Sequence, residues 1–268
     1  MNPIQRNNVR VQGVGTKPML FAHGFGCDQS MWRFVAPAFE PDHRVVLFDN
    51  IGAGGSDLSA YNRTKYSTLA GYADDVVAIC RALELRDVVF VGHSVSAMIG
   101  VLAAIKAPEL FERLVLVAPS PRYIHDKGYV GGFTQEDIEG LLELLDSNYM
   151  AWSSMLGPTI MGNPDRPELA TELTNSFCRT NPEIARHFAR VTFLSDNRAD
   201  LPKLRKPSLI LQCSQDAIAP DAVGEYLQRN LADSQLVKMR ATGHCPNLSA
   251  PEETVAAIRA FLSTRVQA

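Results

Sequence analysis

The stretch VVFVGHSVS, residues 88–96, decides which fold this sequence can adopt. Four apolar residues predict a buried strand, which runs into a serine flanked by small residues, and a helical pattern starts at once. A serine at such a turn takes a strained backbone conformation that holds its hydroxyl clear of the sheet. The positions two before and two after it must be small because strand and helix backbones nearly touch there; Gly92 meets this requirement, and Ser96 replaces the commoner glycine. The motif predicts that Ser94 is a nucleophile.

Two further residues complete a nucleophilic system in the chain order Ser…Asp…His. His244 lies in a loop between the last predicted strand and the last predicted helix, from which it can reach across the sheet to Ser94. Asp216 follows another predicted strand, where its carboxylate can bind the far ring nitrogen, fix the tautomer and stabilise the imidazolium. Residues 117–120, after the preceding strand, include no carboxylate, and Asp49 lies too far along the sheet order. We therefore predict Asp216 as the acid and His244 as the general base.

A glycine-flanked turn, FAHGFG at residues 21–26, follows an early strand. In this position a loop supplies one backbone N–H to an oxyanion, and the residue after the nucleophile supplies the other. We predict Phe25 and Val95 as these donors. Gly24 and Gly26 let the backbone turn inward, and the loss of one such donor costs about 2.7–4 kcal/mol of transition-state stabilisation.

Short apolar runs alternate with helical patterns along most of the chain, which is typical of a mostly parallel sheet with crossover helices. Most runs are continuous rather than alternating, as expected when helices cover both faces. The predicted strands are 19–22, 44–48, 87–91, 113–117, 208–213 and 235–240. The predicted helices are 30–39, 69–83, 95–106, 222–230 and 251–264.

Residues 122–200 break this alternation, since they contain no convincing strand and several helix starts in succession. The helix-start signals are Thr134 with Asp137 near the capping-box position, Arg166 before Pro167, and Asn181 before Pro182. We expect a helical lid at 122–200, inserted into a core formed by residues 1–121 and 201–268. With the serine turn, this organisation predicts the α/β class and an α/β-hydrolase fold with an inserted lid.

Composition excludes several other classes of protein. The chain has 268 residues and a net charge of −3, without a Lys/Arg run, which argues against nucleic-acid or anionic-membrane partners. Residues 1–10 lack the apolar core of a secretory signal, and no apolar run reaches the roughly 20 residues that span a bilayer, so we expect a cytoplasmic protein. The five cysteines are scattered and odd in number, so neither a disulfide framework nor a zinc site is expected.

No metal or cofactor site is expected either. The glycine-rich stretch GAGGSD, residues 52–57, lacks the third glycine and the following helix of a dinucleotide-binding loop. We interpret it as a packing turn beneath the active site. No metal-ligand constellation occurs in the sequence, and a triad that supplies its own base needs no cofactor.

Three stretches together resemble one branch of the α/β-hydrolases. They are HGFGCDQS at 23–30, DNIGAG at 49–54 and VGHSVSAMIG at 91–100. The resemblance continues through residues 120–123, 131–133 and 243–244, so it covers nearly the whole chain. That branch contains the bacterial sigma-B stress-regulator hydrolase RsbQ and the plant karrikin and strigolactone receptors. The serine at position 96 is shared with the karrikin-receptor type.

The resemblance implies a V-shaped lid of four helices over an apolar pocket. It also implies slow hydrolysis of esters or butenolide-type lactones and, in several members, a signalling role. For the stress-regulator type the implied partner is a PAS-domain phosphatase. From the residues themselves we expect aromatic side chains to wall the pocket: Phe25, Phe133, Trp152, Phe188 and Phe193. Such a pocket suits a small neutral ester or lactone.

Two functions remain open from the sequence. The first is a serine hydrolase that acts through an acyl-Ser94 intermediate on small apolar esters or lactones. The second is a ligand-sensing regulator, in which slow hydrolysis alters the lid and through it a protein partner. Both functions use the same fold and the same triad, so these residues do not separate them.

Overall fold

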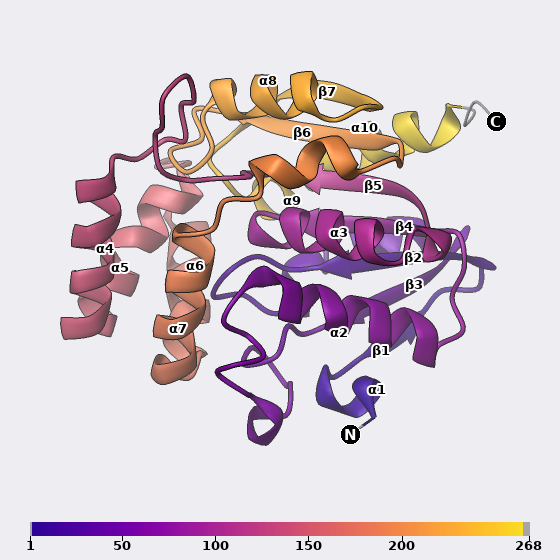
Figure 1. The fold of residues 1–268 in the computed structure, drawn as a ribbon, viewed down its shortest axis with the longest axis horizontal. Coiled ribbons are helices and arrows are strands. Elements are labelled where there is room, and N and C mark those ends of the chain that lie inside the picture. The colour runs from indigo at the N-terminus through magenta and orange to yellow at the C-terminus, as the bar shows by residue number, and fades with distance from the viewer. Residues whose placement is uncertain (1, 265–268) are drawn as a thin grey trace.

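A seven-stranded sheet runs through the protein, which is described from residue 2 to residue 264 by a computed structural model. The strand order is β1-β3-β2-β4-β5-β6-β7 (Figure 1), and all neighbours are parallel except β1 and β3. The strands are β1 (Arg10–Gln12), β2 (Lys17–Ala22), β3 (His43–Phe48), β4 (Val88–His93), β5 (Phe111–Val117), β6 (Ser208–Ser214) and β7 (Ser234–Thr242). The predicted mostly parallel sheet is confirmed.

Helices cover both faces of the sheet, which explains the continuous apolar runs. Along β4, Phe90 packs in one core, whereas Val89 and Val91 pack in another on the opposite face. The first core includes side chains from α2 (Leu69–Ala82), α3 (Val95–Lys106) and α8 (Asp221–Asn230). The second is closed by α10 (Pro251–Ser263) and by two 3₁₀ helices, η1 (Gln29–Trp32) and η2 (Ala36–Phe39).

The predicted helix over residues 30–39 is wrong, since η1 and η2 replace it. Pro37 has no N–H to donate within a continuous α-helix, and it disfavours the α conformation at the residue before it. The short edge strand β1 is an element that the sequence analysis missed, because all three of its residues are exposed and none shows an apolar pattern. The short elements α1 (Pro3–Arg6), η3 (Leu58–Ala60), η4 (Pro108–Leu110), η5 (Arg198–Lys203) and α9 (Pro246–Ser249) were also not predicted.

Four helices follow one another between β5 and β6 and stand together at one end of the molecule (Figure 1). They are α4 (Gln135–Ser147), α5 (Tyr149–Met161), α6 (Pro167–Arg179) and α7 (Pro182–Phe193). The three predicted helix starts are confirmed: a Thr134–Asp137 capping box precedes α4, Pro167 opens α6, and the Asn181 side chain caps α7. The start of α5 was missed, although Asn148 caps it by accepting a hydrogen bond from the N–H of Ala151.

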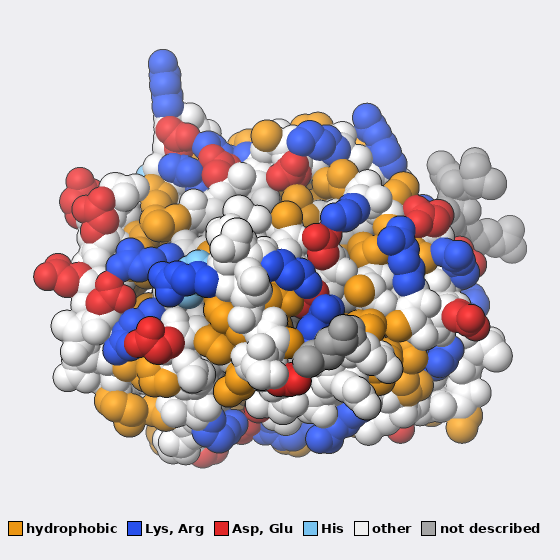
Figure 2. All heavy atoms as spheres, turned by 60° about the horizontal axis from the view of Figure 1, so that its bottom comes forward, with side chains coloured by type: hydrophobic (Ala, Val, Ile, Leu, Met, Phe, Trp, Pro, Cys, Tyr) orange, Lys and Arg blue, Asp and Glu red, His pale blue; other side chains and the backbone are white. Residues whose placement is uncertain are grey.

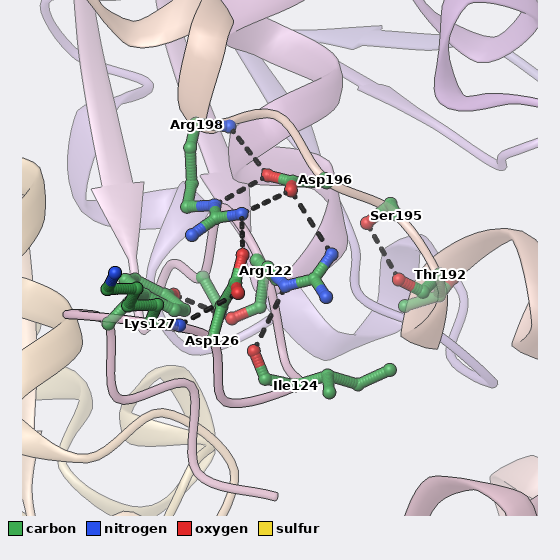
Figure 3. Close-up of polar contacts among 10 residues, drawn as sticks. Arg122, Ile124, Asp126, Lys127, Thr192, Ser195, Asp196 and Arg198 are labelled. Carbon is green, nitrogen blue, oxygen red and sulfur yellow. Dashed lines mark hydrogen bonds and ion pairs between the residues drawn. The ribbon is translucent and has the colours of Figure 1, made fainter. Parts of the chain in front are cut away.

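Ion pairs fasten the two ends of this helical segment to one another (Figure 3). Arg122, in the segment between β5 and α4, binds the carboxylate of Asp196, in the segment between α7 and β6, at 3.1 Å. Arg198 binds Asp196 at 2.7 Å and Asp126 at 2.6 Å, and the Arg198 hydrogen bond lowers the pKa of the Asp196 carboxyl below its usual range. Charged side chains from the two segments that connect the sheet with α4–α7 therefore form one cluster of ion pairs.

Acidic and basic side chains are interspersed over the face drawn in Figure 2, with apolar side chains between them. This face has no extended surface of a single charge, in keeping with the small net charge of −3. Within residues 2–264, no helix combines the length and the apolar character that crossing a membrane requires.

Candidate active site

The turn between β4 and α3 places Ser94 at the carboxyl edge of the sheet. Ser94 has φ +56° and ψ −125°, a region that non-glycine residues rarely occupy, and is 7% exposed. Gly92 is required because a Cβ on it would lie 2.5 Å from the carbonyl oxygen of Ser96. A Cβ on Gly100 would lie 2.2 Å from the ring of Phe90, so α3 and β4 are in close contact at two points. The backbone thus adopts the strained turn that the sequence predicts.

Three side chains from different strand ends form one hydrogen-bonded chain. The hydroxyl of Ser94 lies 2.8 Å from Nε2 of His244, and Nδ1 of His244 lies 2.8 Å from Oδ2 of Asp216. Oδ1 of Asp216 accepts the backbone N–H groups of Ile218 and Ala219 at 2.8 and 3.0 Å. All three side chains are buried. The structure therefore brings together the predicted nucleophile, base and acid with the geometry of proton transfer from serine to histidine.

His93 has a positioning contact that the sequence analysis missed. Its ring lies 5.2 Å from the ring of His244 and contributes to the cavity beside Ser94. Its Nε2 donates a hydrogen bond of 2.8 Å to the carbonyl oxygen of His244. Burial, together with the neighbouring His244, lowers the pKa of His93 to about 3. A neutral ring thus holds the loop that carries His244.

The burial of His93 predicts an acid-dependent loss of stability. The pKa of His93 is about 3 in the folded protein and about 6.5 in an unfolded chain, so below about pH 6.5 only the unfolded state takes up this proton. The free energy of unfolding therefore decreases as the pH is lowered from about 6.5 towards 3, by at most about 1.4 kcal/mol per pH unit. Between about pH 6.5 and 4.5, wild type should lose about 2–3 kcal/mol more than His93→Gln in urea titrations. Equal losses in the two proteins would contradict this assignment.

The loop after β2 lies against the serine turn. A Cβ on Gly24 would come within 3.3 Å of Cβ of Ser94 and 2.7 Å of Nδ1 of His93, so only glycine fits there. Among the hydrogen bonds of residues 2–264, the N–H groups of Phe25 and Val95 have no acceptor. The N–H of Ser94, by contrast, is bound to the carbonyl of Val117 at 2.8 Å. The two predicted oxyanion donors are therefore free to bind a ligand.

An apolar cavity of about 30 Å³ adjoins Ser94. Its lining residues are Phe25, Cys27, His93, Ser94, Tyr123, Ile160, Leu173, Phe177, Thr192, Phe193, Ile218, His244 and Cys245. About one water molecule would fill this space, whereas ligand pockets usually measure roughly 300–1,000 Å³. A substrate can therefore enter only if the lining side chains or the helices α4–α7 move.

Of the predicted pocket aromatics, Phe25 and Phe193 line the cavity and the other three do not. Phe177, in α6, lines the cavity instead. Its ring centroid lies 6.1 Å from that of Phe25 and 5.5 Å from that of Trp152. Phe188 instead stacks on Tyr72 with ring centroids 4.5 Å apart. The structure therefore places Phe25 and Phe193 at the cavity wall and does not bring Trp152, Phe188 or Phe133 to it. Phe133 is partly buried and packs against the hydrophobic cluster that contains the side chains of α4–α7.

The cavity also contains two polar groups that the sequence analysis missed. The hydroxyls of Tyr123 and Thr192 are buried and have no hydrogen-bond partner among residues 2–264. Burial raises the pKa of Tyr123, and the neighbouring Ser94 hydroxyl partly offsets this effect. Tyr123 follows β5 closely at the same edge of the sheet as Ser94, which is the sequence signal that could have identified it.

The thiols in the cavity are poor competitors for the serine. Cys27 and Cys245 are buried, free cysteines. Burial raises the pKa of both thiols well above the usual range, so the nucleophilic thiolate is scarcely populated.

A larger groove of about 850 Å³ lies elsewhere on the surface. It is lined largely by polar and charged side chains, including those of Arg10, Asp28, Arg33 and Arg179, and reaches neither Ser94 nor His244. Ser94 and His244 therefore lie at the smaller cavity and not at this groove.

Comparisons with known proteins show the family to which the chain belongs. A family model described as the alpha/beta hydrolase family matches residues 19–258. The karrikin insensitive 2 receptor CA of Petunia hybrida is 41% identical, over 94% of this chain and 93% of its own length. The strigolactone esterase D14 of Arabidopsis thaliana is 37% identical, over 97% of this chain and 98% of its own.

A solved structure has a very similar fold. A hydrolase from Oleispira antarctica superposes with a TM-score of 0.96 and 40% identity, over 98% of this chain and 97% of its own. The resemblance stated from the sequence motifs is thereby confirmed. The chain belongs to the alpha/beta hydrolase family, within which it is similar to a karrikin insensitive 2 receptor and to a strigolactone esterase.

Proposed function

We propose that this protein is a serine hydrolase that cleaves small apolar esters or butenolide-type lactones through an acyl-Ser94 intermediate. The observation that supports this proposal most strongly is the chain of hydrogen bonds from Ser94 through His244 to Asp216, both of 2.8 Å, at the wall of an apolar cavity. The names of two relatives, strigolactone esterase and probable esterase, are in keeping with it.

The proposal gives each group of the site one role. Oγ of Ser94 attacks the carbonyl carbon of the substrate while Nε2 of His244 accepts the hydroxyl proton, and Asp216 stabilises the imidazolium that forms. The negative charge that develops on the carbonyl oxygen is bound by the N–H groups of Phe25 and Val95. Collapse of the tetrahedral intermediate breaks the ester bond, and His244 gives its proton to the departing alkoxide oxygen. Water, activated by His244, then hydrolyses the acyl-serine; in a lactone the alcohol stays attached to the acyl group.

The cavity favours a neutral ligand of modest size. Among residues 2–264, no Lys, Arg, Asp or Glu side chain lines the cavity, so a charged substrate group would be buried without a counter-ion from them. The free hydroxyls of Tyr123 and Thr192 can bind oxygen atoms of the ligand beyond the reacting carbonyl. These features suit an ester or lactone better than a peptide or a phosphate.

The proposal assigns residues 122–200 the role of a lid whose underside selects the substrate. Phe193, near the end of α7, is 4% exposed and lines the cavity, with its ring 6.1 Å from that of Phe25. Phe193→Ala should raise KM for small esters and admit bulkier acyl groups, while kcat for an acetate ester changes little. Pocket shape discriminates by about 1–3 kcal/mol per methylene-sized change. The measurement is kcat/KM across a series of p-nitrophenyl esters of increasing acyl length.

Phe133→Ala is the matched control, because this aromatic side chain lies outside the cavity lining. Phe193→Leu, which keeps an apolar side chain, guards against loss of folding in the alanine variant. Unchanged acyl selectivity in both Phe193 variants would remove this residue from the pocket.

A ligand-sensing regulator is the second candidate function, and the size of the cavity favours it. Because the cavity of about 30 Å³ is smaller than an ester, binding requires movement of its lining side chains or of α4–α7, and a movement of α4–α7 would alter the outer surface. Relatives are named as karrikin insensitive 2 receptors, which is in keeping with such a role. The predicted partner of the stress-regulator type is a PAS-domain phosphatase.

One experiment compares the two functions. Turnover is screened across aryl esters and synthetic butenolides beside Ser94→Ala, and hydrogen exchange of α4–α7 is measured with the best butenolide. Multiple turnovers without a change in exchange would favour a metabolic hydrolase. A single slow turnover with lasting loss of protection in α4–α7 would favour the regulator, and partner capture with and without the butenolide would then follow.

A further inference from the structure

The residue that departs from the usual elbow motif is in contact with the loop that contains Phe25. Ser96, the second residue of α3, is fully buried. Its hydroxyl donates a hydrogen bond of 2.5 Å to the carbonyl oxygen of His23, the residue that starts this loop. A glycine at position 96 could not make this bond. Close approach between β4 and α3 is already provided by Gly92 and Gly100, so a side chain at position 96 is accommodated.

Asn50, at the end of β3, completes the same cluster. Its side-chain N–H group reaches both Oγ of Ser96 and the carbonyl oxygen of His23 at 3.2 Å. Its backbone N–H donates to Nε2 of His23 at 3.0 Å. Because Nε2 accepts this bond, the ring proton lies on Nδ1, which donates to the carbonyl oxygen of Gly24 at 2.8 Å.

These bonds fix the two peptide groups that precede Phe25. The carbonyl of His23 belongs to the His23–Gly24 peptide, and the carbonyl of Gly24 belongs to the Gly24–Phe25 peptide. Since a peptide group is planar, holding the Gly24 carbonyl also sets the direction of the Phe25 N–H. The other oxyanion donor, Val95 N–H, lies one residue before Ser96. One hydroxyl thus connects the chain segments that carry the two donors.

We infer that Ser96 is a positioning residue, which holds the Phe25 N–H in convergence with the Val95 N–H. This inference rests on the hydrolase function proposed above. Ser96, His23 and Asn50 are all absent from the cavity lining. Their effect on the reaction therefore passes through the loop and not through contact with the substrate. Loss of the Ser96 hydroxyl should weaken binding of the oxyanion in the transition state and leave binding of the ester in its ground state nearly unchanged.

The test compares Ser96→Ala and Ser96→Gly with wild type on p-nitrophenyl acetate. Loss of an oxyanion donor costs about 10²–10³ in kcat, so a displaced donor should cost about 10- to 100-fold, with KM within about twofold of wild type. Ser208→Ala is the matched control: Ser208 is also buried and bonds a carbonyl, that of Lys206, but lies at the start of β6. It should keep wild-type kcat, and thermal unfolding of all the variants shows how much stability each loses.

A thionoester provides the readout that a merely structural defect would not change. The sulfur of O-(p-nitrophenyl) thionoacetate is a poor hydrogen-bond acceptor, so its hydrolysis gains little from the two N–H donors. We expect the ester-to-thionoester ratio of kcat/KM to fall about tenfold or more in both Ser96 variants. An unchanged ratio, or a kcat equal to that of Ser208→Ala, would overturn the inference. If wild type itself shows no turnover that depends on Ser94, the proposed function fails instead, so the two failures are distinguishable.

Discussion

Replacement of Ser94 by alanine is expected to lower ester turnover at least about a thousandfold and to leave the fold intact. The strained turn presents one hydroxyl to the cavity, and that hydroxyl is the group within 2.8 Å of Nε2 of His244. Alanine keeps the Cβ and the positive φ of +56°, so the local backbone strain is the same in both proteins. The measurement is kcat/KM for p-nitrophenyl acetate, with thermal unfolding as the control for folding.

Residual activity above about a thousandth of wild type would indicate another nucleophile. The candidates are the thiols of Cys27 and Cys245, which line the same cavity. Their raised pKa values argue against them. Treatment of the Ser94→Ala protein with iodoacetamide distinguishes a reactive thiol from a contaminating hydrolase. Alkylation would abolish activity that depends on a cysteine thiol, whereas a contaminating serine hydrolase would stay active.

The second large effect is expected at the base and the acid. His244→Ala should reduce kcat nearly as far as Ser94→Ala, because Nε2 of His244 lies 2.8 Å from the Ser94 hydroxyl and is the base that accepts its proton. Asp216→Asn should cost about 10³–10⁴ in kcat, since an amide can present an N–H to Nδ1 and hold the ring in the wrong tautomer. The measurement is kcat at saturating p-nitrophenyl acetate for each variant.

Asp49→Asn is the control for this prediction, because Asp49 is the other buried carboxylate considered as the acid. The structure gives it a scaffold role: its oxygens accept the N–H groups of Gln29 and Gly55 and the side-chain amide of Asn8. Asp49→Asn should therefore reduce stability more than it reduces kcat. A silent Asp216→Asn together with an inactive Asp49→Asn would reverse the assignment of the acid.

The nucleophile, base and acid could be placed from sequence because each follows a strand of a parallel sheet. The carboxyl ends of such strands meet at one edge, so the order Ser94, Asp216, His244 is enough to bring the three residues together. The turn at Ser94 adds a strict local requirement, since a Cβ on Gly92 would collide with the backbone of α3. Sequence rules of this kind depend on backbone geometry and transfer well between proteins.

The cavity wall could not be predicted in the same way. Which side of a lid helix faces Ser94 depends on how α4–α7 cross one another, and spacing along one helix does not contain that information. Thus Phe177 lines the cavity, whereas Trp152 and Phe188 pack behind the lining. The spacing of Leu173 and Phe177, four residues apart on α6, was available as a signal, but it equally describes ordinary helix packing.

The role of His93 was missed for a related reason. Its ring direction depends on the carbonyl of His244, a contact between residues 151 positions apart in the chain. The hydroxyl of Ser96 binds His23 across 73 positions, and this bond likewise becomes visible only in three dimensions. In sequence, Ser96 is a departure from a motif, whereas in the structure it is a hydrogen-bond donor with a specific acceptor.

The central claim is that an acyl group passes through the oxygen of Ser94. It is tested most directly by rapid acid quenching during turnover of a slowly deacylating ester, such as p-nitrophenyl pivalate, followed by intact-mass measurement and peptide mapping. The account predicts a transient mass increase of one pivaloyl group on the peptide that contains Ser94, and none in Ser94→Ala. Turnover without an adduct on Ser94, or with the acyl group on Cys27 or Cys245, would contradict it.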